Sequence, residues 1–253
     1  MNILKKIIMP LLGLLLWELL AKWLNNPVII PPVESVINIL MNPQTSVLGT
    51  GNLIENTLIS IKRVISGFII AGIIGIPLGI FMGYFSTIMD LFDTFIELLR
   101  PIPPLAWVPL ALAWFGIGET SMLFIIFIGA FFPILLNTIA GVKSVPKILI
   151  ESIETLGAKE KDILLKIILP ASSPSILTGL RIGAGIAWMC VVAAEMLPGS
   201  SSGLGYLIMY SYSLGRMDIV VASMIIIGMI GLILDRGLKY LENRYFKWKS
   251  LTK

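Results

Sequence analysis

Side chains that could do covalent or metal chemistry are scarce in this sequence. It contains no histidine and a single cysteine, Cys190. Without histidine there is no imidazole ligand for a metal or haem and no Ser-His or Cys-His nucleophile pair, and one cysteine excludes an internal disulfide. The phosphate-binding pattern G-x-x-x-x-G-K-[ST] is also missing. We therefore predict no catalytic residue, no metal site and no ATP hydrolysis by this chain.

A charged segment lies at residues 151 to 170, where the chain reads ESIETLGAKEKDILLKIILP between two apolar blocks. Pro146 suits the first turn of a helix, Gly157 tolerates the positive φ that ends one, and Pro170 stops one. The segment therefore predicts two short helices that meet at Gly157.

Both predicted helices, residues 145 to 156 and 158 to 169, are amphipathic. Such a pair forms a knob that suits a groove on a soluble partner, and the alternative is a loop that rests on lipid headgroups. The apolar positions are Ile148, Leu149, Ile153 and Leu156 on the first helix and Ile163, Leu164, Ile167 and Ile168 on the second.

The rest of the chain is too apolar for a soluble protein, since 57% of the residues are hydrophobic and 13% are charged. We predict an all-α membrane protein of about six transmembrane helices, with residues 1 to 253 as a single domain. In the third span Pro101, Pro103, Pro104 and Pro109 interrupt the start, so a tilted or re-entrant helix is the alternative there. The predicted spans are about 7 to 24, 62 to 85, 102 to 117, 119 to 141, 176 to 196 and 218 to 239.

Lysine and arginine predict the orientation of these spans. They collect between residues 143 and 166 and in the tail, and basic segments next to spans remain on the cytoplasmic side. Both termini are then cytoplasmic, the protein is multi-pass, and its basic charge faces lipid headgroups rather than nucleic acid. The basic residues concerned are Lys5 and Lys6 at the start and Arg236, Lys239, Arg244, Lys247, Lys249 and Lys253 in the tail.

A stripe of small residues follows one face of the second span, at Ala71, Gly75, Gly79 and Gly83. Small residues at four-residue spacing let a second helix approach closely. The stripe predicts helix packing within the subunit, with a subunit interface as the alternative.

Few polar or aromatic side chains in the spans could border a translocation path. Arg181 and Glu195 flank the fifth span, and an ionisable group at such a position is either an anchor or a functional group. Glu195 is a candidate path residue, and Trp107, Trp114 and Trp188 are weaker candidates, because tryptophans more often pack or mark the membrane interface.

The charged segment resembles the EAA loop of ABC importer permeases. The matching skeleton is Glu151, Gly157, Ile167, Leu169 and Pro170, although a serine and an isoleucine replace the usual alanines after Glu151. LRPIPPLAWVPL from residue 99, FFPILLNT from residue 131 and SGLGY from residue 202 are similar to the nitrate, sulfonate and taurine branch of these permeases.

The resemblance implies a type I ABC importer permease fold with a family-like core at about residues 60 to 240 and a cytoplasmic coupling loop at about residues 143 to 170. It further implies two ABC ATPase subunits that bind ATP and Mg²⁺, a second permease copy as a homodimer, and an extracytoplasmic solute-binding protein. A small solute such as nitrate, a sulfonate or taurine would be the substrate, in the cell membrane. The implied coupling residues are Glu151, Glu154, Leu156, Gly157, Ala158, Ile167, Leu169 and Pro170.

Two other functions are weighed against this one. A gradient-driven secondary transporter or channel would need acidic side chains in mid-span, and only Glu195 approaches that description. An intramembrane enzyme would need a base, and no lysine lies in the middle of a predicted span to serve in place of histidine.

Overall fold

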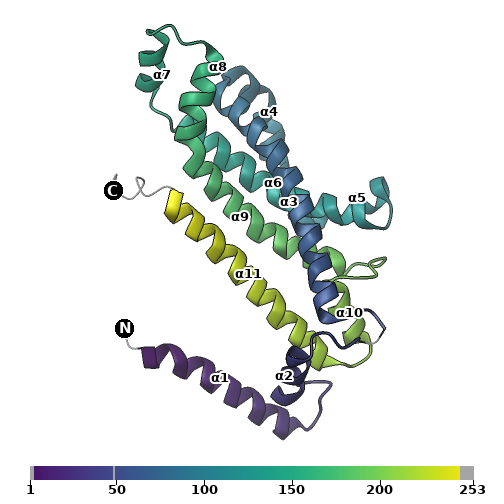
Figure 1. Ribbon diagram of the computed structural model, residues 1–253. Coiled ribbons are helices and arrows are strands. Elements are labelled where there is room, and N and C mark those ends of the chain that lie inside the picture. The colour runs from purple at the N-terminus through teal and green to yellow at the C-terminus, as the bar shows by residue number, and fades with distance from the viewer. Residues whose placement is uncertain (1–2, 48, 246–253) are drawn as a thin grey trace. The chain divides into compact units, whose positions relative to one another are not determined.

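Helices make up nearly all of the described chain, which confirms the predicted all-α class (Figure 1). The computed structural model describes residues 3–47 and 49–245, without the side chains of residues 3–7 and 243. The 3-10 helix η1 and the π-helix η2 interrupt the series of α-helices. In chain order the elements are α1 (Ile3–Leu24), α2 (Val33–Met41), α3 (Leu53–Tyr84), α4 (Ser86–Leu99), η1 (Pro104–Trp107), α5 (Val108–Phe115), α6 (Glu119–Lys143), α7 (Lys147–Glu154), α8 (Glu160–Ile163), η2 (Leu164–Ile168), α9 (Leu169–Glu195), α10 (Leu204–Ser213) and α11 (Met217–Tyr245).

The chain divides into two compact units. Unit 1 comprises Met1–Ile61 and Glu195–Ile230, and unit 2 comprises Lys62–Ala194 and Gly231–Lys253. The expectation of a single permease domain stays a prediction. Some basic residues that predict the orientation, Lys247, Lys249 and Lys253, lie outside the described residues, as do the side chains of Lys5 and Lys6.

The predicted multi-span membrane fold is confirmed, with four or five candidate spans where the sequence predicted about six. The first predicted span forms α1, but some of its side chains are not described, so that span stays a prediction. Within the residues searched, the candidates are the single spans Leu53–Tyr84, Glu119–Lys143, Glu160–Glu195 and Met217–Glu242, and the bent pair Ser86–Leu99 with Pro104–Phe115.

The predicted third span forms η1 and α5, which are the second half of this bent pair. The two helices meet at 91°, so the alternative suggested by the prolines describes this region better than one continuous helix. Pro101, Pro103 and Pro104 carry no backbone N–H and therefore cannot continue the hydrogen bonds of α4. The sequence did not predict α4 itself, because acidic residues such as Asp90 and Asp93 interrupt its hydropathy.

The stripe of small residues on α3 lies against α6 within unit 2. A Cβ built on Gly79 would lie 2.7 Å from Thr138 Cβ, and one built on Gly83 would lie 2.6 Å from Val142 Cβ. Ala71 is completely buried. Contacts this short mean that the two helix backbones approach as closely as glycine allows, so larger side chains would force them apart.

Candidate functional site

The charged segment folds into a helix, a glycine turn and a second helix, as the sequence predicts. α7 ends in a turn where Gly157, with φ of 81°, donates its N–H to Glu154 O at 2.9 Å. The Ala158 N–H reaches back to Ile153 O at 3.2 Å. This pair of bonds is the Schellman motif, in which glycine adopts the left-handed conformation at little cost. The prediction that Gly157 ends the first helix is confirmed.

The second helix does not stop at Pro170, and this part of the prediction is wrong. α8 continues through η2 into α9, and Pro170 is the second residue of α9. In the π-helix the Leu169 N–H bonds to Leu164 O, one residue further back than in an α-helix. The wider turn accommodates the ring and the missing N–H of Pro170. The segment is therefore continuous with a candidate span.

A buried apolar cluster fixes this segment to the ends of α3 and α6. Val142, Ile163 and Ile168 form its centre, and Tyr84 of α3 and Ile153 of α7 pack against it. Figure 1 shows α7 and α8 together at one end of the unit 2 helices. A displacement of the segment would therefore act directly on two candidate spans.

The predicted apolar stripe on the first helix is divided between two faces. Ile153 is half-buried, whereas Ile148 is 65% exposed and Leu156 is 84% exposed. Glu151 and Glu154 are exposed beside them. The outer face, which we call the coupling surface, therefore combines apolar and acidic side chains, and its apolar members are Ile148, Leu149 and Leu156. Of the other predicted coupling residues, Gly157 and Pro170 are exposed and Ala158, Ile167 and Leu169 are partly buried.

Glu195 occupies a different kind of site, in unit 1, where three side chains accept the first N–H groups at the start of α10. The Gly205 N–H donates to Glu195 Oε2 at 3.0 Å, the Leu204 N–H to Ser60 Oγ at 2.9 Å, and the Gly203 N–H to Asn56 Oδ1 at 2.8 Å. The first N–H groups of a helix have no partner within it, so these bonds satisfy groups that would otherwise be unpaired.

The Glu195 carboxylate is held from both sides. It is 0% exposed, and the Ser60 hydroxyl lies 2.9 and 2.8 Å from its two oxygens. A Cβ built on Gly203 would overlap this carboxylate, and Gly203 also has φ of 108°. The sequence pointed to Glu195 but not to Asn56 or Ser60. Polar residues one turn apart on an apolar helix were the available signal.

The three candidate tryptophans lie in unit 2 in unlike surroundings. Trp114 is 57% exposed, and its ring meets Phe124 edge to face with centroids 6.0 Å apart. Trp107 also meets Phe124 edge to face, at 6.4 Å. Trp188 is 4% exposed and lies beside Gly231 of α11. The structure therefore places two tryptophans around one phenylalanine and the third in the packing between α9 and α11.

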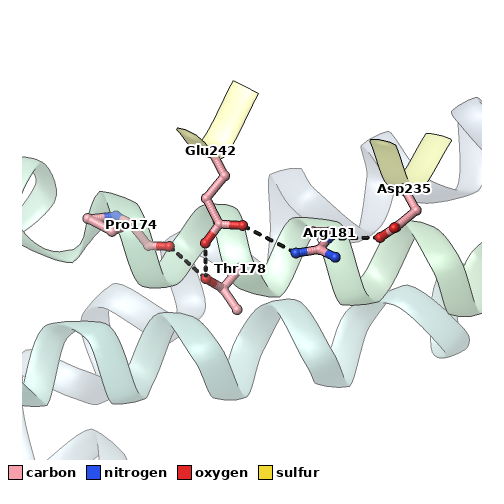
Figure 2. Close-up of polar contacts among 5 residues, drawn as sticks. All are labelled: Pro174, Thr178, Arg181, Asp235 and Glu242. Carbon is pink, nitrogen blue, oxygen red and sulfur yellow. Dashed lines mark hydrogen bonds and ion pairs between the residues drawn. The ribbon is translucent and has the colours of Figure 1, made fainter. Parts of the chain in front are cut away.

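Arg181 of α9 binds α11 (Figure 2). Its Nε donates to Asp235 Oδ1 at 2.9 Å, and its Nη1 lies 3.5 Å from Glu242 Oε2. Thr178 Oγ1 lies 2.9 Å from Pro174 O and 3.4 Å from Glu242 Oε1. These contacts tie α9 to α11 within unit 2. Across the described parts of the chain, no group of three His, Cys, Asp or Glu side chains could hold a metal ion.

Comparison with known proteins adds the family. The model of the family described as "Binding-protein-dependent transport system inner membrane component" matches residues 75–247. An ABC transporter permease protein of Methanocaldococcus jannaschii is 70% identical over 98% of this chain and 93% of its own length. The taurine transport system permease of Escherichia coli is 37% identical over 92% of this chain and 84% of its own length.

One further relative and one solved structure also match this chain. The nitrate import permease of Synechocystis is 36% identical over 91% of this chain and 84% of its own length. Among solved structures, an inward-facing MetNI methionine ABC transporter matches with a TM-score of 0.59 and 18% identity, over 74% of this chain and 95% of the matched chain. At that identity the likeness concerns the fold alone.

Proposed function

This chain belongs to the family of binding-protein-dependent transport system inner membrane components. On that premise we propose how transport through this permease subunit is driven. It is an ABC importer permease of the nitrate, sulfonate and taurine branch. In our proposal residues 143 to 170 dock on a separate ATPase through the coupling surface. Motion of that ATPase then reaches the translocation path through the spans attached to the segment.

The observation that carries this proposal is the two-sided character of the segment. Leu156 is 84% exposed on its outer face, while Ile163 and Ile168 are each 1% exposed on its inner face. An exposed apolar group beside carboxylates gains most when a partner covers it. The buried face makes the segment rigid with α3, α6 and α9, so a rigid-body displacement would pass into the membrane helices.

We propose the remaining components from the family. Two ATPase subunits would bind ATP and Mg²⁺, a second copy of this chain would complete the permease pair, and an extracytoplasmic solute-binding protein would deliver the substrate. The charged segment and both termini would face the cytoplasm, because the basic residues collect there.

For the substrate we propose a small solute with an anionic oxygen group. Two relatives are permeases named for taurine and for nitrate. Taurine is a sulfonate, and both sulfonates and nitrate carry an anionic oxygen group. Glu195, Trp107, Trp114 and Trp188 stay our proposed path residues. With Glu195 0% exposed and Trp188 4% exposed, these two would shape the path from behind its lining in this conformation.

Copurification tests the coupling surface. The tagged chain would be expressed with the genes that flank it and purified in mild detergent, as wild type, as Leu156→Asp, and as Met41→Asp. Met41 is the matched control, because it is 75% exposed but lies on α2, outside the segment. We expect wild type and Met41→Asp to recover an ATPase, and Leu156→Asp to recover about tenfold less, because an aspartate would carry a charge into the apolar contact.

Two results would contradict the proposal. Equal recovery with Leu156→Asp would remove the coupling surface from the contact. Folded wild-type chain without any ATPase would favour the gradient-driven alternative.

A further inference from the structure

Unit 2 contains a cavity of about 500 Å³ at the bend between α4 and η1. Its walls come from the bend itself, from α6 and from α9. Most of the lining is apolar, as in Ile128, Phe132 and Ile182, and the polar members are Arg100 and Asn137. A largely apolar cavity with a few converging polar groups is the usual form of a small-molecule site.

Arg100 is an unusual residue at this place. No other lysine or arginine occurs between Arg63 and Lys143. It caps the C-terminal end of α4, which begins at Ser86 next to the buried cluster under the charged segment. Fourteen residues of helix are about 21 Å long, so α4 carries Arg100 well away from the end of unit 2 that holds the charged segment.

No described carboxylate forms an ion pair with this arginine, and the nearest one in sequence, Glu97, lies three positions earlier on α4. The negative end of α4 favours a cation at its C-terminus only weakly when the group is exposed, as Arg100 is. An arginine without a partner is costly wherever water is excluded. Helix capping therefore does not account for Arg100. Binding of an anion in the cavity would account for it.

Asn137 adds a neutral donor to the same wall. One of its amide hydrogens is used in a bond from Nδ2 to Pro133 O at 2.8 Å. A side-chain amide has two such hydrogens, so the second is available to a guest in the cavity. The planar fork of arginine matches two oxygens of a nitrate, carboxylate or sulfonate group better than a lysine would.

We propose that Arg100, assisted by Asn137, forms an anion-binding station for the substrate in this cavity. This inference rests on the proposed transport function for its biological role, and it names the substrate class as solutes with an anionic oxygen group. The station supplies the compensating charge while the substrate is out of water, and the apolar remainder of the lining keeps the binding weak enough for release.

The test measures the charge preference of the cavity without any assumption about transport. In a Cys190→Ala background, a cysteine at Ile182, which lines the cavity and is 46% exposed, would react with an anionic sulfonatoethyl or a cationic trimethylammonioethyl methanethiosulfonate. We expect Arg100→Gln to lower the anionic-to-cationic rate ratio about tenfold, and Arg100→Lys to restore most of it.

Matched controls distinguish the cavity from the rest of the surface. Arg236→Gln removes an exposed arginine elsewhere in unit 2 and should leave the ratio at Ile182→Cys unchanged. For a cysteine at Leu156, on the charged segment, Arg100→Gln should leave the anionic-to-cationic rate ratio unchanged. An unchanged ratio at Ile182→Cys in Arg100→Gln would overturn the station, even if an ATPase copurifies. A lowered ratio without any copurified ATPase would keep the station and reject the proposed coupling.

Discussion

The charged segment and the Glu195 site use the same kinds of residue in opposite ways. At the segment, acidic and apolar side chains lie exposed around a glycine with nothing within 4 Å of its Cβ position. At the start of α10 an acidic side chain is 0% exposed and a glycine has no room for a Cβ. A mutation should therefore act on partner binding in the first region and on folding in the second.

The difference has a simple energetic origin. A buried polar group whose hydrogen-bond partner is removed costs about 1–3 kcal/mol, and more if it is charged. An exposed side chain away from such features changes stability by about 0.5 kcal/mol or less. Three N–H groups depend on the Glu195 site, namely those of Gly203, Leu204 and Gly205.

The largest effect is expected at Gly203. In Gly203→Ala the new methyl group would overlap the Glu195 carboxylate, and the backbone would keep a strained φ of 108°. We expect a loss of several kcal/mol of stability, seen as little monodisperse protein in detergent. Gly228→Ala is the control, because its Cβ would meet nothing within 4 Å in α11. Equal yields of the two variants would show that the α10 cap can relax.

Glu195→Gln should have a smaller effect, because it keeps the size of the side chain. One carboxylate oxygen becomes an amide nitrogen, which cannot accept the bonds from Ser60 and Gly205 as the two oxygens do. We expect about 1–3 kcal/mol of destabilisation, measured as a lower midpoint in a thermal aggregation assay. Glu34→Gln, at an exposed position of α2, serves as the control.

This variant also separates two roles for Glu195. A normal melting midpoint with altered transport would make the residue a gate rather than a cap. A lowered midpoint would leave its path role as an indirect one.

The contrast also shows what sequence alone could predict. Gly157 identified the turn of the charged segment, because a left-handed glycine is a local feature. Pro146 indicated its start to within about one residue, since α7 begins at Lys147 directly after this proline. The same reasoning failed at Pro170, because a π-helix can absorb a proline and nothing in the spacing announces one. Local rules predict where a helix can end, but tertiary packing decides whether it does.

The Glu195 site was beyond such rules for another reason. Ser60 and Glu195 are separated by 135 positions, and a single sequence contains no signal that joins them. The sequence showed the small-residue stripe on α3, but it could not predict that α6 is the helix that packs against this stripe. Arg100 was passed over for a similar reason, since only the bend of α4 and the adjoining helices reveal the cavity it lines.

The smallest effect on stability, and the most direct test of the contrast, is expected at Gly157. In Gly157→Val the side chain meets open space, so the cost is the strain of a β-branched residue at φ of 81°, about 1–2 kcal/mol confined to the turn. Membrane insertion and yield should stay near wild type, while ATPase recovery and transport-coupled ATP hydrolysis fall, because Leu156 would leave its position on the coupling surface. Gly185→Ala, which also meets nothing within 4 Å, controls for a general effect of filling a glycine. If Gly157→Val lost folded protein as Gly203→Ala is expected to, the turn would be part of the folding core, and the distinction between an exposed surface for a partner and a buried cap for the fold would not hold.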